Sequence, residues 1–174
     1  MRVIGFVAPS GTGKTTLLVG VIAALRARGL QVAVLKHGHH AADPDIPGKD
    51  THRFRQAGAE GVLFAGPGLW FQIQQFQGEP PTLEEHLARL AGHDLILIEG
   101  YADHPHPKIA LFRATAARGW SERPFHNIVA VACDAPPPAT LVGVPQLPLN
   151  EPGRVADFVL EYLGLNQAGS KSSE

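Results

Sequence analysis

The sequence predicts a three-layer α/β/α fold with a mostly parallel central sheet and an added β-hairpin. An apolar run at Val3–Val7, a helix-periodic segment and a second apolar run at Val32–Leu35 follow one another at the start of the chain. This strand–helix–strand order predicts two parallel strands joined by a right-handed crossover. A further run at Leu95–Ile98 is apolar at every position, which is typical of a strand buried on both faces.

The remaining elements are predicted from the spacing of apolar residues and from residues that cap helices, end helices or form turns. Residues 15–28 carry apolar residues on one helical face, and Gly29 ends that helix. Two apolar runs flank Gly66-Pro67-Gly68 and predict the hairpin. Thr82-Leu83-Glu84-Glu85 is a capping box that opens another helix. The other predicted elements are a short helix capped by Asp50, strands at Ile109–Phe112 and Ile128–Ala132, and a helix at Arg154–Leu163.

Length and composition favour one cytoplasmic domain over residues 1–165. The 174 residues match the roughly 100–200 residues typical of a domain. The single cysteine, Cys133, favours a reducing compartment. Fifteen basic residues against 16 acidic ones argue against binding to nucleic acid or membrane by charge, and no apolar run approaches the ~18 residues of a spanning helix. Residues 166–174 are small and polar, and we expect a disordered tail.

The strongest functional motif follows the first strand and opens the first helix. Residues 8–16, Ala-Pro-Ser-Gly-Thr-Gly-Lys-Thr-Thr, match the phosphate-binding loop G-x-x-x-x-G-K-[ST] with alanine in the first glycine position. Gly11 and Gly13 let the backbone curl so that its N–H groups face phosphate oxygens. Lys14 can reach the β- and γ-phosphates, Thr15 can bind Mg²⁺, and Thr16 can donate to the α-phosphate. This context predicts a P-loop nucleotide-binding fold.

Glu99 ends the buried strand at Leu95–Ile98. Ligands of open α/β sheets bind at the carboxyl ends of the parallel strands. The carboxylate is therefore expected beside the phosphate loop, where it could hold a Mg²⁺-bound water or polarise an attacking one. The alternative is a strand-end acid that accepts a bond from a nearby backbone N–H.

A His-rich loop leaves the second strand at the same sheet edge. Lys36 and His37 are expected to meet phosphates, and Asp45 is expected to approach Mg²⁺. His39 and His40 also suggest a transition-metal site, although their spacing fits no standard zinc pattern. A plain surface loop is the third interpretation.

Four further side chains have weaker signals. Asp134 ends the strand at Ile128–Cys133, where GTP-binding proteins can place an Asp that reads guanine. Lys108 follows the acidic strand end, where it could contact a phosphate or a second substrate; a solvated turn is the alternative. Arg53 and Arg55 are expected on the solvated face of the short helix.

Taken in order, these motifs resemble the molybdopterin-guanine dinucleotide biosynthesis protein B (MobB) family. The phosphate loop alone is common to many proteins, whereas the segments after it are more specific. The resemblance rests on Ser10–Leu17, Lys36-His37, His39-His40, Asp45–Asp50, Arg53, Gln56–Ala59, Asp94–Gly100 and Pro107-Lys108.

The resemblance implies a GTP-binding adaptor of the molybdenum cofactor pathway. It implies a homodimer that assists the guanylyltransferase MobA, which attaches GMP to molybdopterin, and it implies slow GTP hydrolysis with Mg²⁺. By family motif, phosphate binding is assigned to Ser10, Gly11, Thr12, Gly13, Lys14, Thr15 and Thr16, and a nucleotide or Mg²⁺ role to Asp45 and Glu99. The alternatives are a small kinase acting on a nucleotide or cofactor precursor and a metal-delivery protein using the His loop.

Overall fold

The computed structural model describes residues 1–38, 43–119, 125–141 and 143–165. These residues belong to two compact units. The sheet unit comprises Met1–His37 and the chain from Leu87 onward, and the hairpin unit comprises Gly38–His86. A single domain over residues 1–165 stays a prediction, and the expected disordered tail lies outside the described residues.

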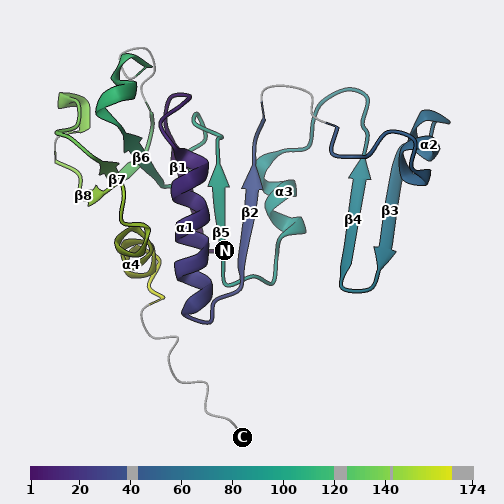
Figure 1. The fold of residues 1–174 in the computed structure, drawn as a ribbon, viewed down its shortest axis with the longest axis horizontal. Helices are drawn as coiled ribbons and strands as arrows, with labels where there is room; N and C mark the ends of the chain where they lie inside the picture. Colours follow the sequence, from purple (N-terminus) through teal and green to yellow (C-terminus); the bar gives the residue numbers. More distant parts are fainter. Residues whose placement is uncertain (39–42, 120–124, 142, 166–174) are drawn as a thin grey trace, which may run out of the picture. The chain divides into compact units, whose positions relative to one another are not determined.

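The sheet unit is built on six strands that pair in parallel (Figure 1). Their order places β1 and β6 at the centre. Strand β5 lies between β1 and β2, so it separates the two strands of the predicted N-terminal strand–helix–strand unit. Because all six run the same way, their carboxyl ends meet at one edge of the sheet, where α/β proteins bind ligands. In spatial order the strands are β2 (Val32–Lys36), β5 (Leu95–Glu99), β1 (Val3–Val7), β6 (Lys108–Phe112), β7 (Ile128–Cys133) and β8 (Gln146–Pro148).

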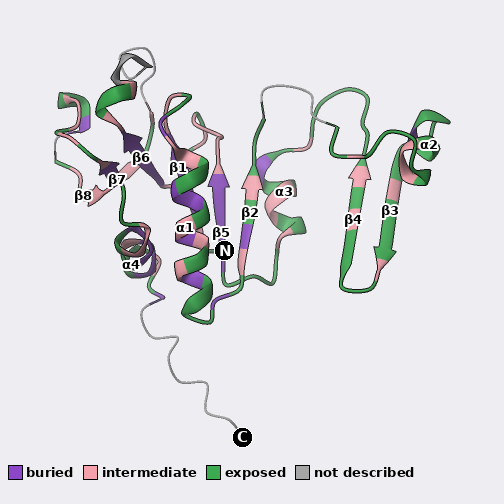
Figure 2. Ribbon diagram, in the orientation of Figure 1, coloured by how far each residue is buried: buried purple, intermediate pink, exposed green. Residues whose placement is uncertain are grey.

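Two helices cover one face of this sheet. Helices α1 (Lys14–Ala27) and α4 (Pro152–Tyr162) pack together and bury their apolar residues against β1, β5 and β6 (Figure 2). Leu25 and Val159 are fully buried there. The opposite face holds a smaller core around Phe112, which includes Leu141 of the short helix η2 (Ala139–Leu141). Another short helix, η1 (Ala114–Gly119), follows β6.

The hairpin unit contains α2 (Asp50–Gln56) and an antiparallel pair, β3 (Gly61–Gly66) and β4 (Leu69–Gln74). Helix α3 (Leu83–Arg89) begins in this unit and ends in the sheet unit. The predicted capping box opens α3: the Thr82 N–H donates to Glu85 Oε2 at 2.7 Å, and the Glu85 N–H donates to Thr82 Oγ1 at 3.2 Å.

The predicted α/β class with an added hairpin is confirmed, and two local predictions need correction. Asp50 does not cap α2, because Lys49 occupies the cap position with extended backbone and Asp50 lies in the first turn. Strand β8 was not predicted, because three residues that follow Pro145 and end on Pro148 give too short a pattern. Within the described residues, no helix combines the length and the apolar character that crossing a membrane requires.

Candidate functional site

The phosphate loop lies between β1 and α1 at the carboxyl edge of the sheet. Gly11 and Gly13 have φ angles of 77° and 93°, a left-handed backbone that side-chain-bearing residues rarely adopt. Thr12 is buried, and its Oγ1 donates to Pro9 O at 2.8 Å. Ser10 and Thr16 are exposed. The loop is therefore held in a curled shape from inside, while its outer side faces solvent.

Lys14 is the first residue of α1, and its side chain turns back over the loop. Its Nζ donates to Ala8 O at 3.0 Å. Burial lowers the pKa of this ammonium from its usual 10.5; the nearby Glu99 carboxylate opposes the shift and the Lys36 charge adds to it. A partly desolvated cation beside a curled backbone loop is suited to bind a polyphosphate.

Glu99, at the end of β5, joins the phosphate loop to β2. Thr15 Oγ1 donates to Glu99 Oε1 at 3.4 Å, and Lys36 Nζ lies 3.6 Å from Glu99 Oε2. The Glu99 side chain is 14% exposed, whereas Lys36 is 65% exposed. Because a hydroxyl and a carboxylate are hard oxygen donors, Thr15 and Glu99 suit Mg²⁺. The structure thus brings together three residues that the sequence placed in one site.

The chain that follows Glu99 packs closely on the end of β2. The His37 N–H donates to Glu99 O at 2.9 Å, and the His37 and Tyr101 rings lie 4.3 Å apart. A Cβ added at Gly100 would come within 3.0 Å of His37 Cβ, so the Glu-Gly pair leaves room for His37. His37 therefore lies beside Glu99 through its backbone. His39 and His40 lie outside the described residues.

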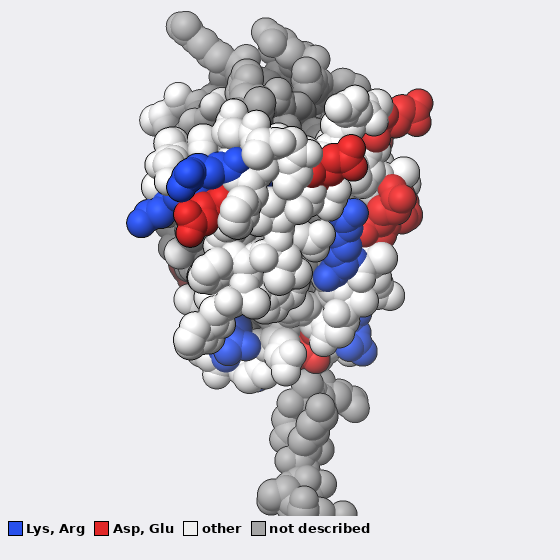
Figure 3. Space-filling model, turned by 90° about the vertical axis from the view of Figure 1, so that its right-hand side faces the viewer, with Lys and Arg blue, Asp and Glu red and all other residues white. Residues whose placement is uncertain are grey.

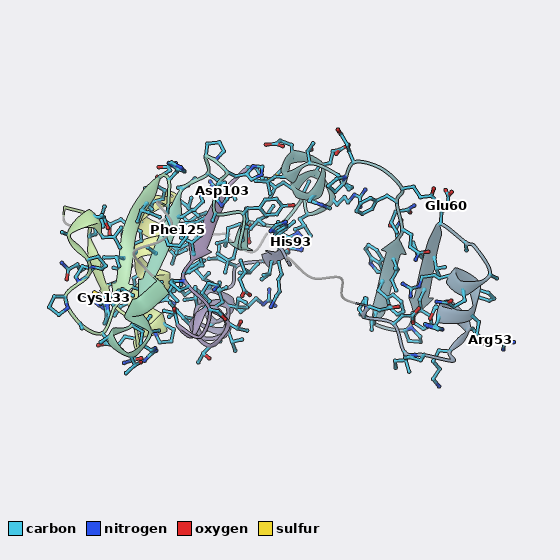
Figure 4. All side chains as sticks on the ribbon, turned by 90° about the horizontal axis from the view of Figure 1, so that it is seen from above. Arg53, Glu60, His93, Asp103, Phe125 and Cys133 are labelled. Atoms are coloured by element: carbon cyan, nitrogen blue, oxygen red, sulfur yellow. The ribbon has the colours of Figure 1, made fainter. Side chains whose placement is uncertain are left out.

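Asp45 belongs to the hairpin unit, where its carboxylate has two partners. Thr51 Oγ1 donates to Asp45 Oδ1 at 2.8 Å, and Arg55 Nε lies 3.4 Å from Asp45 Oδ2. Arg55 also binds Asp43 at 2.5 Å. The expectation that Arg55 is solvated was wrong, because its side chain is only 6% exposed. Arg53, on the same helix, is exposed as expected (Figure 4). A Mg²⁺ role for Asp45 stays a prediction.

Asp134 follows β7 and is held by a residue that the sequence analysis missed. Arg113, directly after β6, donates from Nη1 to Asp134 Oδ2 at 3.2 Å and from Nε to Thr12 O at 3.0 Å. Its Nη2 donates to Asn150 Oδ1 at 3.4 Å, and the Ala114 N–H donates to Asp134 Oδ1 at 2.9 Å. Cys133, next to Asp134, is labelled in Figure 4, which views the molecule from above. The signal for Arg113 was its place after a predicted strand at the ligand-binding edge.

Lys108 lies in neither of the places that the sequence suggested. Its side chain is fully buried, and its Nζ donates to the carbonyl oxygens of His104, His106 and His126. Burial lowers the pKa of this ammonium, while the Asp103 charge opposes the shift. The expectation of a contact with a phosphate or second substrate, or of a solvated turn, was therefore wrong: Lys108, at the start of β6, binds carbonyl oxygens of the loop before β6 and of the loop before β7.

His106 predicts a loss of stability in acid. Among the described residues both ring nitrogens are buried without a hydrogen-bond partner, and desolvation, followed by the Lys108 and His104 charges, lowers the pKa of His106 to about 4. Between pH 6.5 and about 4 the unfolded chain binds this proton and the folded chain does not, so the free energy of unfolding falls as the pH drops. After allowance for solvent screening the fall is about 1–2 kcal/mol.

Urea unfolding at pH 7 and pH 4.5 measures this loss. His106→Gln is expected to make the free energy of unfolding less dependent on pH over this window, and His93→Gln, at an exposed site, serves as the control. An unchanged slope in His106→Gln would contradict the assignment.

The comparisons with known proteins agree on one family. Residues 3–134 match the family model described as molybdopterin guanine dinucleotide synthesis protein B. The molybdopterin-guanine dinucleotide biosynthesis adapter protein of Escherichia coli K12 is 38% identical over 164 residues, which is 92% of each chain. The protein of the same name from Haemophilus influenzae is 34% identical over 165 residues, covering 92% of this chain and 88% of its own.

Solved structures show the same fold. The crystal structure of Bacillus subtilis MobB matches with a TM-score of 0.74 at 24% identity over 94% of this chain and 98% of that one. A shorter match, 43% identical over 63 residues, links the chain to a tetraacyldisaccharide 4'-kinase of Azotobacter vinelandii, but it spans 19% of that enzyme. The family model and the two bacterial adapter proteins cover most of this chain, and the chain belongs to the molybdopterin guanine dinucleotide synthesis protein B (MobB) family.

Proposed function

We propose that this chain binds GTP with Mg²⁺ at residues 8–16 and acts as an adaptor in the synthesis of molybdopterin guanine dinucleotide. One observation carries the nucleotide site: Lys14, Thr15 and Lys36 gather around the Glu99 carboxylate beside a curled loop. Membership of the MobB family supports the adaptor role.

Each group at this edge has a distinct part in binding the triphosphate. The backbone N–H groups around Gly11 and Gly13 cradle the phosphates, and Lys14 exchanges its bond to Ala8 O for phosphate oxygens. Thr15 and Glu99 would hold Mg²⁺, whose charge offsets that of the triphosphate. Lys36, whose Nζ lies 3.6 Å from the other oxygen of Glu99, adds positive charge beside the carboxylate.

Hydrolysis by the isolated chain is slow in this proposal. Rapid GTP hydrolysis needs a group that orients water and an arginine that neutralises the transition state. Arg113, which lies beside the phosphate loop in the described structure, donates to Thr12 O, Asp134 and Asn150. We expect a rate on the order of 10⁻² s⁻¹ or below, as for unassisted GTPases.

The partner in this proposal is the guanylyltransferase MobA. Mixing the two purified proteins at limiting GTP and measuring molybdopterin guanine dinucleotide tests the adaptor role. Product formation is expected to rise when this chain is added. Turnover of many molecules per second by the chain alone, with a small acceptor phosphorylated, would establish the kinase alternative instead.

Glu99→Gln is expected to separate nucleotide binding from hydrolysis. The amide preserves the side-chain shape and the bond to Thr15, but it removes the charge that acts on Mg²⁺ or water. GTP affinity in calorimetry should stay within about threefold of the parent, because the phosphate cradle is unchanged, while phosphate release should fall at least about tenfold. Asp94→Asn, at an exposed carboxylate before β5, is the control. Equal hydrolysis by the parent and Glu99→Gln would remove Glu99 from the catalytic assignment.

A homodimer is part of the same proposal, and the hairpin unit supports it. In the described part of this unit, Leu83 is the only apolar residue that is buried. The two-stranded pair has apolar side chains on both faces, and Leu63, Leu69 and Trp70 are 61%, 64% and 67% exposed. Figure 3 shows one face of the molecule, with uncharged residues across its centre. Isolated two-stranded hairpins are marginally stable, so a second copy would supply the missing core.

Trp70→Asp is expected to shift the protein from dimer to monomer. Loss of a central aromatic contact costs about 2 kcal/mol or more, which is roughly a 30-fold weaker dimer. Sedimentation velocity over a concentration series measures the change. Val19→Asp places the same charge at a 62%-exposed position on α1 and should leave the dimer intact. Identical sedimentation of Trp70→Asp and the parent would exclude this surface.

A further inference from the structure

Three side chains at the ends of neighbouring strands form one hydrogen-bonded set beside the phosphate loop. Arg113 follows β6, Asp134 follows β7 and Asn150 follows β8. The Arg113 guanidinium binds Asp134 through Nη1 and Asn150 through Nη2, while its Nε binds Thr12 O inside the loop. One rigid planar group therefore ties the phosphate loop to the two neighbouring polar side chains.

This arrangement determines which polar atoms Asn150 and Asp134 offer to a ligand. Because Arg113 occupies Oδ1 of Asn150, the amide is oriented with its N–H₂ group, a donor, away from the guanidinium. Asp134 accepts one bond on each oxygen, from Arg113 and from the Ala114 N–H. Each carboxylate oxygen can accept a second bond, and both Asp134 and Asn150 are exposed residues. The pair thus presents one donor beside an acceptor carboxylate.

That pattern is complementary to guanine and not to adenine. The guanine edge carries an acceptor, O6, next to the donors N1–H and N2–H₂. Adenine carries a donor, N6–H₂, next to the acceptor N1. A carboxylate facing guanine N1–H and N2–H₂ and an amide N–H₂ facing O6 would satisfy every group. In the same place, adenine N6–H₂ would face the amide donor and adenine N1 would face the carboxylate acceptor.

We propose that Asn150 is a specificity-determining residue for guanine, acting with Asp134, and that Arg113 is the positioning residue that orients both. The proposal rests on the proposed binding of GTP and names the side chains that would distinguish it from ATP. Through its bond to Thr12 O, Arg113 also keeps the base-reading pair at a constant distance from the phosphate loop.

Calorimetry with GTP, ATP and inorganic triphosphate, each with Mg²⁺, tests this assignment. The measured quantity is the ratio of the dissociation constants for ATP and GTP. Asn150→Asp keeps an oxygen for Arg113 and replaces the donor that faces O6 by an acceptor. It should lower the ratio at least about tenfold and leave inorganic triphosphate affinity unchanged. Arg113→Ala should lower the ratio about tenfold as well, because the Asn150 and Asp134 side chains lose the group that orients them.

Controls separate this proposal from a structural role and from the proposed function. Arg28→Ala removes an ion pair with Asp157 far from the loop, so it should leave the ratio unchanged even if the protein becomes less stable. If Arg113 has a purely structural role, Arg113→Ala would weaken the binding of GTP and of ATP equally. A parent-like ratio in both Asn150→Asp and Arg113→Ala would overturn the inference. Equal affinity of the unmodified protein for GTP and ATP would instead overturn the proposed selectivity for GTP.

Discussion

Lys14→Ala is expected to weaken GTP binding by about tenfold to 150-fold. The substitution removes a charge-assisted contact that contributes on the order of 1.5–3 kcal/mol. Lys14 is half-buried in the loop, which lowers the pKa of its ammonium, and a bound phosphate would interact strongly with a charge that is partly removed from water. Calorimetry with GTP and Mg²⁺ measures the loss.

The fold should survive this change, because Lys14 makes its one described side-chain hydrogen bond to Ala8 O and is not part of the apolar core. Circular dichroism is expected to match that of the parent. Lys49→Ala, at an exposed lysine of the hairpin unit, controls for the loss of a positive charge. Parent-like GTP affinity in a folded Lys14→Ala protein would refute the phosphate-loop assignment.

Lys108→Met is expected to produce the largest loss of stability among the variants considered. Methionine fills a similar volume but leaves three carbonyl oxygens, those of His104, His106 and His126, without their common donor. Each buried carbonyl that loses its partner costs about 1–3 kcal/mol. We expect a total of about 3 kcal/mol or more, or a fall in Tm of roughly 6–12 °C for a chain of this size.

Thermal unfolding followed by circular dichroism measures this difference. Lys36→Met is the matched control: that lysine is 65% exposed, so its Tm should change little. An unchanged Tm in Lys108→Met would mean that water replaces the ammonium at the three carbonyls. Because the tied loop leads from Glu99 to β6, weaker GTP binding is expected to accompany the lower stability.

The secondary structure was largely predictable because its signals are local. The curled loop at Gly11 and Gly13, the capping box at Thr82 and the uniformly apolar strand β5 each depend on residues within a few positions of one another. The place of Glu99 was predictable too, because parallel strands end at one edge and its strand ends on a carboxylate. Strand β8 was missed because a three-residue strand has no period to detect.

The roles of the buried cations were not predictable from the same patterns. Arg55 and Lys108 lie in polar segments that are typical of solvated turns and helix faces, yet both are buried. A lysine or an arginine is buried only where oxygen partners surround it. For Arg55 those partners are the carboxylates of Asp43 and Asp45, and for Lys108 they are backbone carbonyl oxygens, which every residue carries and no sequence pattern marks.

By itself, the sequence determined the phosphate-binding loop, the order of the longer strands and helices along the chain, and the acid at the end of β5, since each follows from short-range spacing. The tertiary structure decided which distant side chains act together. Arg113 and Thr12 are 101 positions apart and Arg113 and Asn150 are 37 apart, and the sheet order β1-β6-β7-β8 brings them to one edge. A hydrogen bond forms wherever folding brings donor and acceptor within about 3 Å, so the guanidinium that connects the phosphate loop to Asp134 and Asn150 exists only once the strands have paired.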